Sequence, residues 1–477
     1  MTTSEGVERE AVERPQPPGG GGMIADYFKF AERGTDLWTE ARGGLTTFMV
    51  MVYIVFLNAS ILGDGFKLAA DDPGRIALSA GTALIAGIMT IAMGAWANYP
   101  LALAAGLGIN AIVAFSLTGR GLSPAGAMGV IVLEGLAVTL LVLVGFREAV
   151  MNAVPLALKR AIGAGIGLFI LFIGFANGGL VQSGCSPFVP LPVCAGTLVT
   201  VSFPTTAAQF VFLFGLALTV ILWARRIRAA LVISILGTTL VALAAGVTKI
   251  PDKLALTPNF STLGSFDLGN VFSTLPLLTA LLVIFAIMLT DFFDTMGTVT
   301  GVAAEAGLTR PDGSVPGVGR VLIVDSIAAA VGGLGGVSSN TTYIESAAGV
   351  ADGARTGFAS VVTGVLFLLA ILLAPLAGII PGVATAPALV IVGYLMFTQV
   401  KDINVADVED GFPALLTMIL MPLTYDITVG IGAGFISWVL IKIVRGKMGE
   451  IHPLMWVVSI AFVVFFLQNW IQALLPK

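Results

Sequence analysis

"GGVSSNTTYIESAAG" runs from Gly335 to Gly349 and interrupts a chain that is otherwise strongly apolar. Glycines give way to hydroxyl and amide side chains, and then to a tyrosine and a glutamate that lead back into apolar sequence. Residues Thr342 to Glu345 fit a capping box, in which the glutamate side chain reaches back to the start of a helix. That helix would end near residue 352, too short to cross about 30 Å of hydrocarbon. We therefore expect a half-helix that begins inside the membrane, where its N-terminus favours a polar ligand.

The composition predicts an all-α, polytopic membrane protein. Of the 477 residues, 57% are hydrophobic and 11% are charged, whereas soluble proteins carry about 25% charged residues. Apolar runs close to the roughly 20 residues that cross a bilayer recur along the chain. We expect about fourteen spans, at approximately 43–62, 76–97, 101–118, 125–146, 160–180, 206–223, 229–248, 277–303, 319–335, 341–352, 357–380, 384–400, 411–424 and 427–444.

The loops and chain ends indicate how the protein lies in the membrane. Residues 1–22 are charged and then rich in Pro and Gly, with no apolar signal segment, so we expect a disordered tail. With the N-terminus inside, most loop Lys and Arg residues fall on the inner side, in keeping with the positive-inside rule. Segment 454–474 either spans the membrane or lies in its interface. Cys185 and Cys194 share an outer loop, where they form either a disulfide or two free thiols.

Six acidic residues fall inside or beside the expected spans. A charged group at membrane depth costs about 3 kcal/mol or more, so each one needs a structural or functional reason. No Lys, Arg or His lies mid-span to neutralise them, and the one histidine, His452, follows the fourteenth span. The six are Glu134, Asp291, Asp294, Asp325, Glu345 and Asp426.

Asp291 and Asp294 occur in "LTDFFDTMGTVTG", within a predicted helix at about 277–303. Pro276 suits the start of that helix, which places Asp291 near its middle. Spacings of three and seven predict that Asp291, Asp294 and Thr298 share one face. The alternative is that either carboxyl group caps or hydrogen-bonds a neighbouring helix.

The remaining acids have weaker functional signals. We interpret Glu134 in "VIVLEGLAV" and Asp325 in "LIVDSIAA" as groups that make hydrogen bonds between helices, with a direct role as the alternative. Asp426 in "MPLTYDITVG" is expected in a loop between two short spans.

The first half of the chain contains a counterpart of the opening segment. "PLALAAGLGINAIVAF" (100–115) again places glycines and an asparagine inside apolar sequence. Gly106 and Asn110 have the same spacing as Gly336 and Asn340, about half a chain later. Interrupted segments at matching positions in two halves indicate a transporter site built on inverted repeats.

Taken together, these motifs resemble the purine nucleobase permeases of the AzgA-like branch of the nucleobase–ascorbate transporter superfamily. The resemblance extends from the first predicted span to the fourteenth. Ile112 departs from it, because the family pattern places an aromatic residue after "NA". The segments that carry the resemblance are "TEARGGLTTFMVMVYIVFLN" (39–58), "GLGINA" (106–111), "GIGLFI" (165–170), "DFFDTMGT" (291–298), "SSNTTYIESAAGVADGARTG" (338–357) and "MPLTYDI" (421–427).

The resemblance implies a fold of two inverted seven-span repeats. A short strand would precede each of the half-helices that form spans 3 and 10. Spans from both halves would build a core domain and a gate domain. The expected parts are a cytoplasmic tail at 1–35, core segments at 36–146 and 272–380, gate segments at 147–250 and 381–446, and an extra apolar segment at 447–477.

The resemblance also implies import of a purine base (adenine, guanine, hypoxanthine or xanthine) by proton symport with elevator-type alternating access. In the family, an acid of span 8 and an acid of span 10 bind the base; these map to Asp291 and Glu345. We take Asp291 as the first choice for the proton carrier and Glu345 for the purine clamp. The expected substrate contacts are Asp291, Glu345, Asn110, Gly108, Ala111, Asn340, Thr342, Tyr343 and Thr47, with proton coupling at Asp291, Asp294 and Glu345.

The expected partners are the purine base and the lipid bilayer of the plasma (inner) membrane, with no nucleic acid, metal or cofactor beyond the coupling ion. The sequence leaves open the choice of purine, the choice between H⁺ and Na⁺, and the oligomeric state, although homodimers are common in the superfamily.

Other functions fit the sequence less well. The alternatives of the same fold are a sulfate- or bicarbonate-type anion carrier and a uracil/xanthine transporter, and unpaired acids disfavour an anion. A membrane enzyme would need a metal or nucleophile constellation, which one histidine and two loop cysteines do not supply. A channel would favour rings of polar groups, and the sequence contains no such repeat.

Overall fold

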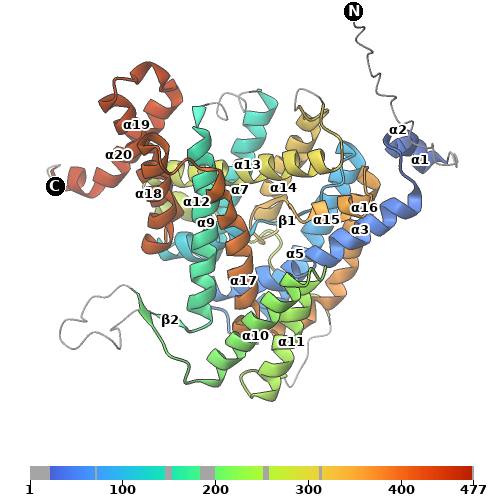
Figure 1. The fold of residues 1–477 in the computed structure, drawn as a ribbon. Coiled ribbons are helices and arrows are strands. Elements are labelled where there is room, and N and C mark those ends of the chain that lie inside the picture. The colour runs from blue at the N-terminus through green and yellow to red at the C-terminus, as the bar shows by residue number, and fades with distance from the viewer. Residues whose placement is uncertain are drawn as a thin grey trace, which may run out of the picture.

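The computed structural model describes residues 22–69, 72–145, 153–182, 199–250, 257–310 and 314–474, and the chain in these ranges is mostly helical (Figure 1). The two predicted loop cysteines lie outside the described residues. The principal helices of the first half are α3 (Leu37–Met51), α4 (Ile54–Gly65), α5 (Pro73–Ala92), α6 (Leu107–Ala111), α7 (Pro124–Leu143), α9 (Leu156–Asn177), α10 (Ala207–Ala224) and α11 (Ala230–Ala244). Those of the second half are α12 (Leu268–Thr274), α13 (Leu277–Glu305), α14 (Val318–Leu334), α15 (Ser346–Ala351), α16 (Gly357–Ala370), α17 (Gly382–Phe397), α18 (Val408–Thr424), α19 (Ile427–Val444) and α20 (Pro453–Leu474).

Shorter elements complete the part of the chain that the structure describes. The helices α1 (Met23–Phe28) and α2 (Phe30–Arg33) precede α3, and four short strands occur: β1 (Leu103–Ala105), β2 (Val181–Gln182), β3 (Thr200–Val201) and β4 (Asn340–Thr342). Two stretches are π-helical, η1 (Met93–Ala97) and η2 (Ile112–Leu117), and three are 3₁₀-helical, η3 (Ile371–Gly378), η4 (Thr398–Asp402) and η5 (Met448–Glu450).

Side-chain caps fix where several helices begin. Asp36 accepts hydrogen bonds from the backbone of α3, and Thr206 forms a full capping box with Gln209 at the start of α10. Ser123 caps α7, and a proline follows it at the first helical position, where the missing N–H costs nothing. Asp426 caps α19, so its predicted place in a loop between two helices is confirmed.

The strands β1 and β4, far apart in sequence, pair antiparallel in the middle of the bundle. The register places Leu103 opposite Thr342, Ala104 opposite Thr341 and Ala105 opposite Asn340. The hydroxyl group of Thr90 in α5 forms hydrogen bonds with both backbone polar groups of Leu103 in β1: it accepts from Leu103 N and donates to Leu103 O. Non-helical backbone is tolerated at membrane depth only when its polar groups are satisfied within the protein. The expected strand before each half-helix is thus present in both halves.

The predicted capping box at Thr342 is wrong. Thr342 belongs to β4, and α15 begins four residues later, at Ser346, with Glu345 in the N-cap position and no side-chain cap. The pairing with β1 holds residues 340–342 extended, so the helix cannot begin there. The prediction of a short half-helix is confirmed, since α15 ends at Ala351.

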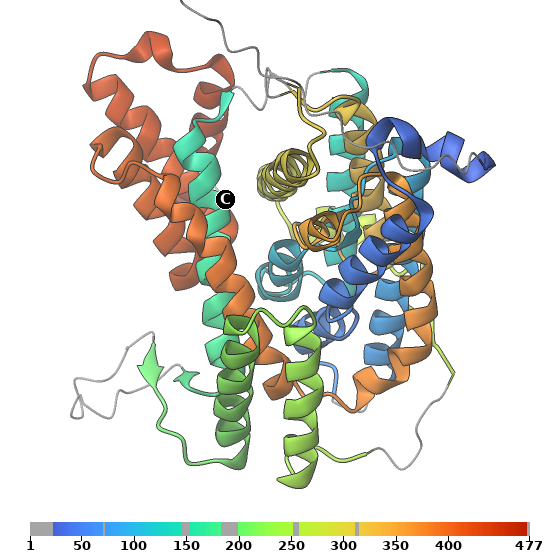
Figure 2. The same cartoon turned by 45° about the vertical axis from the view of Figure 1, so that its right-hand side comes forward.

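Close glycine contacts hold the long helices in two packed groups. The helices α9, α17, α18 and α19 stand at the left of Figure 2, and α3, α5 and α16 stand at the right. In the first group Gly167 of α9 lies against Gly393 of α17, and a Cβ atom on either would come within 2.6 Å of the other's backbone oxygen. In the second group Gly94, in η1 at the end of α5, meets Gly357 of α16 in the same way. Small residues allow such close approach of membrane helices.

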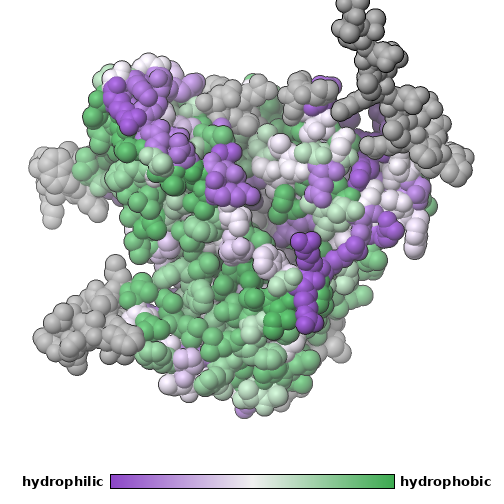
Figure 3. All heavy atoms as spheres, viewed as in Figure 1, coloured by the Kyte–Doolittle hydropathy of each residue, from purple (hydrophilic) through white to green (hydrophobic). Residues whose placement is uncertain are grey.

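An apolar belt surrounds this bundle. Within the described ranges, nine helical segments are long and apolar enough to cross a membrane, and 107–117, 230–244 and 453–468 are shorter apolar helices. Figure 3 shows hydrophobic residues over most of the visible surface, above all its lower half, with most hydrophilic residues in the upper half and near the centre. This belt confirms the prediction of a multi-pass membrane protein. The extra C-terminal segment forms α20, which packs on α19 through Phe435 and Phe462.

Two ion pairs join elements that are far apart in the sequence. Arg228, between α10 and α11, donates from Nη1 and Nη2 to both carboxylate oxygens of Asp352 at 2.6 and 2.5 Å. Asp352 directly follows α15 and also accepts from the hydroxyl group of Thr46 in α3. At another site, Arg120, after η2, pairs with Asp426 at the start of α19.

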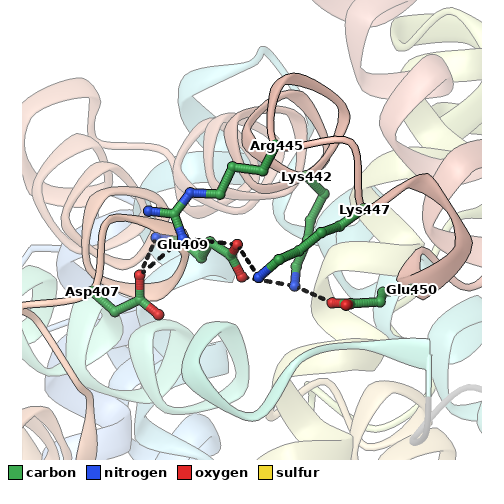
Figure 4. Close-up of polar contacts among 6 residues, drawn as sticks. All are labelled: Asp407, Glu409, Lys442, Arg445, Lys447 and Glu450. Atoms are coloured by element: carbon green, nitrogen blue, oxygen red, sulfur yellow. Dashed lines mark hydrogen bonds and ion pairs between the residues drawn. The ribbon is translucent and has the colours of Figure 1, made fainter.

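A cluster of charged residues ties the start of α18 to the end of α19 (Figure 4). The Glu409 side chain is 8% exposed and lies 2.8 Å from Lys442, 2.9 Å from Arg445 and 2.6 Å from Lys447. Lys442 also binds Glu450 at 2.6 Å. Hydrogen bonds from Lys442, Lys447 and Arg445 lower the pKa of Glu409 from 4.5 to about 2.

Replacing Gly393 with leucine should separate α9 from α17. The side chain has no space at this contact, and overpacking of this kind costs about 1–3 kcal/mol. We expect a lower yield of monodisperse protein and a lower Tm, measured by size-exclusion chromatography and thermal unfolding in detergent. The control is Gly319→Ala in α14, where a Cβ atom would meet nothing within 4 Å; equal loss in both variants would contradict the packing argument.

Glu409→Gln should lower the Tm at neutral pH by removing the acceptor that holds three cations. Because the folded pKa is about 2 and the ordinary value is 4.5, the carboxylate stabilises the fold fully above about pH 4.5. That contribution disappears as the pH falls toward 2, so the Tm difference between variant and parent should narrow over this interval. Glu32→Gln, which disrupts an exposed pair with Lys29, serves as control. A difference that stays constant down to pH 3 would refute the assignment.

Candidate substrate-binding site

The two half-helices begin at opposite ends of the β1–β4 pair. α6 follows β1 and continues as η2, while α15 follows β4. Because the strands are antiparallel, the start of α6 adjoins Asn340, and the start of α15 adjoins Leu103. The ladder continues on both sides, from Gly106 N to Ser339 O and from Tyr343 N to Ala102 O. The two halves of the chain therefore meet at this pair.

Buried polar atoms without a hydrogen-bond partner gather around these strands. Polar atoms buried in proteins almost always have a partner, so a set of unpartnered ones indicates a place for water or a polar ligand. The set comprises Asn110 Oδ1, Ser338 Oγ, Ser339 Oγ, both side-chain polar atoms of Asn340, and Thr342 Oγ1. Three of the predicted contact residues, Asn110, Asn340 and Thr342, belong to it.

Glu345 lies at the start of α15 and is half-buried. Its Oε1 atom accepts a hydrogen bond of 2.8 Å from the hydroxyl group of Tyr53. Tyr53 is fully buried and lies at the break between α3 and α4. It was not among the predicted site residues, and the only sequence signal for it is a lone tyrosine in the apolar run "MVMVYIVFLN".

The two aspartates of α13 face different surroundings. Asp291 is fully buried, and neither carboxylate oxygen has a hydrogen-bond partner. Asp294 is exposed and interacts electrostatically with Glu345, and Gly301, two turns further along, lies near Ile344. Three helical residues advance by about 300°, which leaves the two aspartates about 60° apart. Both lie on one continuous helix at spacings that share a face, as predicted for Asp291, Asp294 and Thr298, but Asp291 and Thr298 are buried whereas Asp294 is exposed.

Asp325 connects α14 to β4 and α13. It accepts hydrogen bonds from the Thr295 hydroxyl group at 2.7 Å and from the Thr342 backbone N–H at 3.1 Å. The hydroxyl groups of Thr295 and Thr341 are also hydrogen-bonded to each other, with their oxygens 2.8 Å apart. The predicted interhelix bonds of Asp325 are confirmed. The interhelix hydrogen bonds predicted for Glu134 are not confirmed, because both of its carboxylate oxygens lack a hydrogen-bond partner.

The other predicted contact residues support the half-helices. The Tyr343 hydroxyl group donates to Ala105 O and so braces α15 against β1. Thr47 of α3 packs on Gly349 in α15, and Gly108 packs on Ile166 of α9. Ala111 is 2% exposed in the hydrophobic core.

The site is built from carboxyl, hydroxyl and amide groups. Among the described residues, no group of three or more His, Cys, Asp or Glu side chains could hold a metal ion. Two discontinuous helices that start beside a shared polar cluster, within a bundle of apolar helices, define a polytopic transporter built from two repeats.

Comparisons with known proteins agree with this class. A profile of the Permease family matches residues 39–433. The guanine/hypoxanthine permease PbuG of Bacillus subtilis is 39% identical over 92% of this chain and 99% of its own, and the adenine permease AdeP of Escherichia coli is 38% identical over 93% and 96%. The transmembrane domain of the cyanobacterial bicarbonate transporter BicA has a TM-score of 0.60 at 16% identity, covering 83% of this chain and 97% of its own.

This chain belongs to the Permease family. The match extends over most of its length, and it confirms the resemblance inferred from the sequence motifs. The likeness to BicA confirms the predicted fold of two inverted repeats.

Tyr53→Phe removes the hydroxyl group that binds Glu345 and preserves the ring. A hydrogen bond to a charged group contributes about 1.5–3 kcal/mol, so we expect KM for the transported substrate to rise at least about tenfold. The measurement is the initial rate of uptake over a range of substrate concentrations. Tyr27→Phe, which removes a bond to Ala95 O outside the site, is the control; equal kinetics in both variants would exclude Tyr53 from the site.

Proposed function

We propose that this protein imports purine nucleobases across the plasma (inner) membrane by proton symport. The observation that carries the proposal is Glu345 at the start of a half-helix, bonded to Tyr53 and close in sequence to the unpartnered buried polar atoms of β4. The names of the relatives support the substrate class, since PbuG is a guanine/hypoxanthine permease and AdeP an adenine permease. The charged loops support an N-terminus on the cytoplasmic side.

A purine base suits this set of acceptors. Its edge carries an N–H beside another N–H or an exocyclic amine, and paired donors match the two oxygens of a carboxylate. Glu345, held by Tyr53, clamps one donor pair. Asp294 contacts the base from the facing helix, and the side-chain amide groups of Asn110 and Asn340 reach its remaining polar atoms. Asp291, buried behind this layer, carries the coupling proton.

Transport proceeds in this proposal by movement of a core domain (36–146 and 272–380) against a gate domain (147–250 and 381–446). The strand pair β1–β4 lies wholly within the core segments, so the binding site moves as one unit. The pairs Arg228–Asp352 and Arg120–Asp426 cross the boundary and must break or rearrange during that movement. The apolar outer face is compatible with a homodimer in the bilayer.

An anion carrier of the same fold is the second candidate, favoured by the fold shared with BicA. Asp294 and Glu345 disfavour it, because two carboxyl groups without a nearby cation repel an anion unless H⁺ or Na⁺ neutralises them. A uracil/xanthine transporter is the remaining alternative, and competition for uptake separates these possibilities.

The test is uptake of radiolabelled purine in cells, with adenine, guanine, hypoxanthine, xanthine and uracil as competitors and with a protonophore. We expect a purine to compete best and the protonophore to abolish accumulation. If only uracil competes for uptake, the protein is a uracil/xanthine transporter. If sulfate or bicarbonate competes, it is an anion carrier. Either result would refute a purine substrate. Accumulation that is unchanged by the protonophore would refute proton coupling.

Glu345→Gln, Asp294→Asn and Asp291→Asn should each reduce purine uptake at least about a hundredfold, because each removes an acceptor or the proton carrier and a mismatched buried polar contact is costly. Membrane insertion, measured by immunoblot, should be preserved. Glu305→Gln, at the exposed end of the same helix α13, is the matched control. Normal uptake by the three site variants would overturn the assignment.

A further inference from the structure

Glu134 is a buried acid that the proposed binding site does not use. It lies in the middle of α7, is 0% exposed, and neither carboxylate oxygen has a hydrogen-bond partner. It takes part in none of the ion pairs among the described residues. An ionised carboxyl group buried in this way costs several kcal/mol, so a residue of this kind needs a reason to be there.

The elements packed on α7 surround Glu134 with acids. α14 packs closely enough that a Cβ atom on Gly135 would meet Ala330 N at 2.2 Å. α14 contributes Asp325 and α13 contributes Asp291; Thr295, one turn beyond Asp291, donates to Asp325 at 2.7 Å, and both helices pack on α7. α12 contributes Asp267, whose carboxylate caps its own helix nearer the start of α7. The fourth element, η2, contains no titratable residue.

Three buried carboxyl groups on helices that pack together disfavour one another's ionisation. Like charges at short distance in a low-dielectric interior disfavour each other, and a bound proton removes one of the charges. No lysine, arginine or histidine pairs with Glu134 or Asp291 in the described part of the chain. Protons are therefore the cations best suited to this cluster.

Hydrogen bonds connect this cluster to the substrate site. Asp325 accepts from the backbone N–H of Thr342, and Thr295 links it to Thr341 of the same strand. β4 leads directly into Glu345 at the start of α15. A change of charge in the cluster therefore acts on the strand that positions Glu345.

We propose that Glu134 is a proton-binding group of the transporter and that, with Asp291 and Asp325, it forms a coupling site separate from the purine contacts at Asp294 and Glu345. One proton neutralises one carboxylate of the coupling site while a purine occupies the contacts at Asp294 and Glu345. This inference rests on the proposed function as a proton-coupled purine transporter, and it adds a residue of the first repeat to the coupling machinery.

The test compares Glu134→Gln with the parent protein in proteoliposomes. Exchange of internal for external purine without a pH gradient needs no net proton movement, whereas accumulation driven by an imposed pH gradient does. We expect accumulation to fall at least tenfold, exchange to fall far less, and the pH dependence of the initial rate to flatten. Glu305→Gln is the matched control. Accumulation and a pH profile like those of the parent would show that Glu134 is only structural.

A second measurement separates this inference from the proposed function. Purine added to purified protein in weakly buffered detergent should cause proton uptake, followed with a pH indicator dye, and Glu134→Gln should reduce the amount taken up. If the parent binds purine without proton uptake, proton coupling itself fails and the inference falls with it. If Glu134→Gln does not fold, Glu134→Asp should fold and shift the pH profile of transport; an unshifted profile would overturn the inference.

Discussion

The hydrogen bonds between β1 and β4 are the constraint on which the rest of the molecule depends. Extended backbone inside a membrane protein is stable only when every N–H and C=O group has a partner. Here each repeat supplies the partner of the other, with Leu103 opposite Thr342 and Ala105 opposite Asn340. Neither strand could remain extended alone, so the binding site exists only when both halves of the chain have folded together.

The acids on the elements around this shared pair form an exposed set and a buried set. Asp294 and Glu345 lie at the exposed side of the junction, next to unpartnered amide and hydroxyl groups. Glu134 of α7, Asp291 of α13 and Asp325 of α14 are buried. β4 is bonded to Asp325 through the backbone N–H of Thr342 and leads into Glu345. In the proposed mechanism, a substrate at the first set and a proton at the second would influence each other through β4.

Local sequence patterns predicted much of the fold and part of the site. The half-helix after "GGVSSNTT", its counterpart at "GLGINA" and the interhelix role of Asp325 followed from glycine placement and from the cost of buried charge. The prediction of a capping box was wrong because pairing with β1, more than 200 residues away in the sequence, holds Thr342 extended. The role of Tyr53 could not be predicted for the same reason, since its hydrogen-bond partner Glu345 lies 292 residues away in the sequence. The surroundings of Asp294 depended on which helix lies opposite, which periodicity alone does not determine.

The half-helix α15 has a polar contact at each end. Glu345 precedes it, and Asp352, which follows it, is held by Arg228 and Thr46. The Arg228 side chain is 63% exposed and the Asp352 side chain 12%, and an ion pair with an exposed partner is weakened by dissolved salt. Ionic strength on that side of the membrane therefore sets how firmly the far end of the half-helix is tethered, without any ion entering the site.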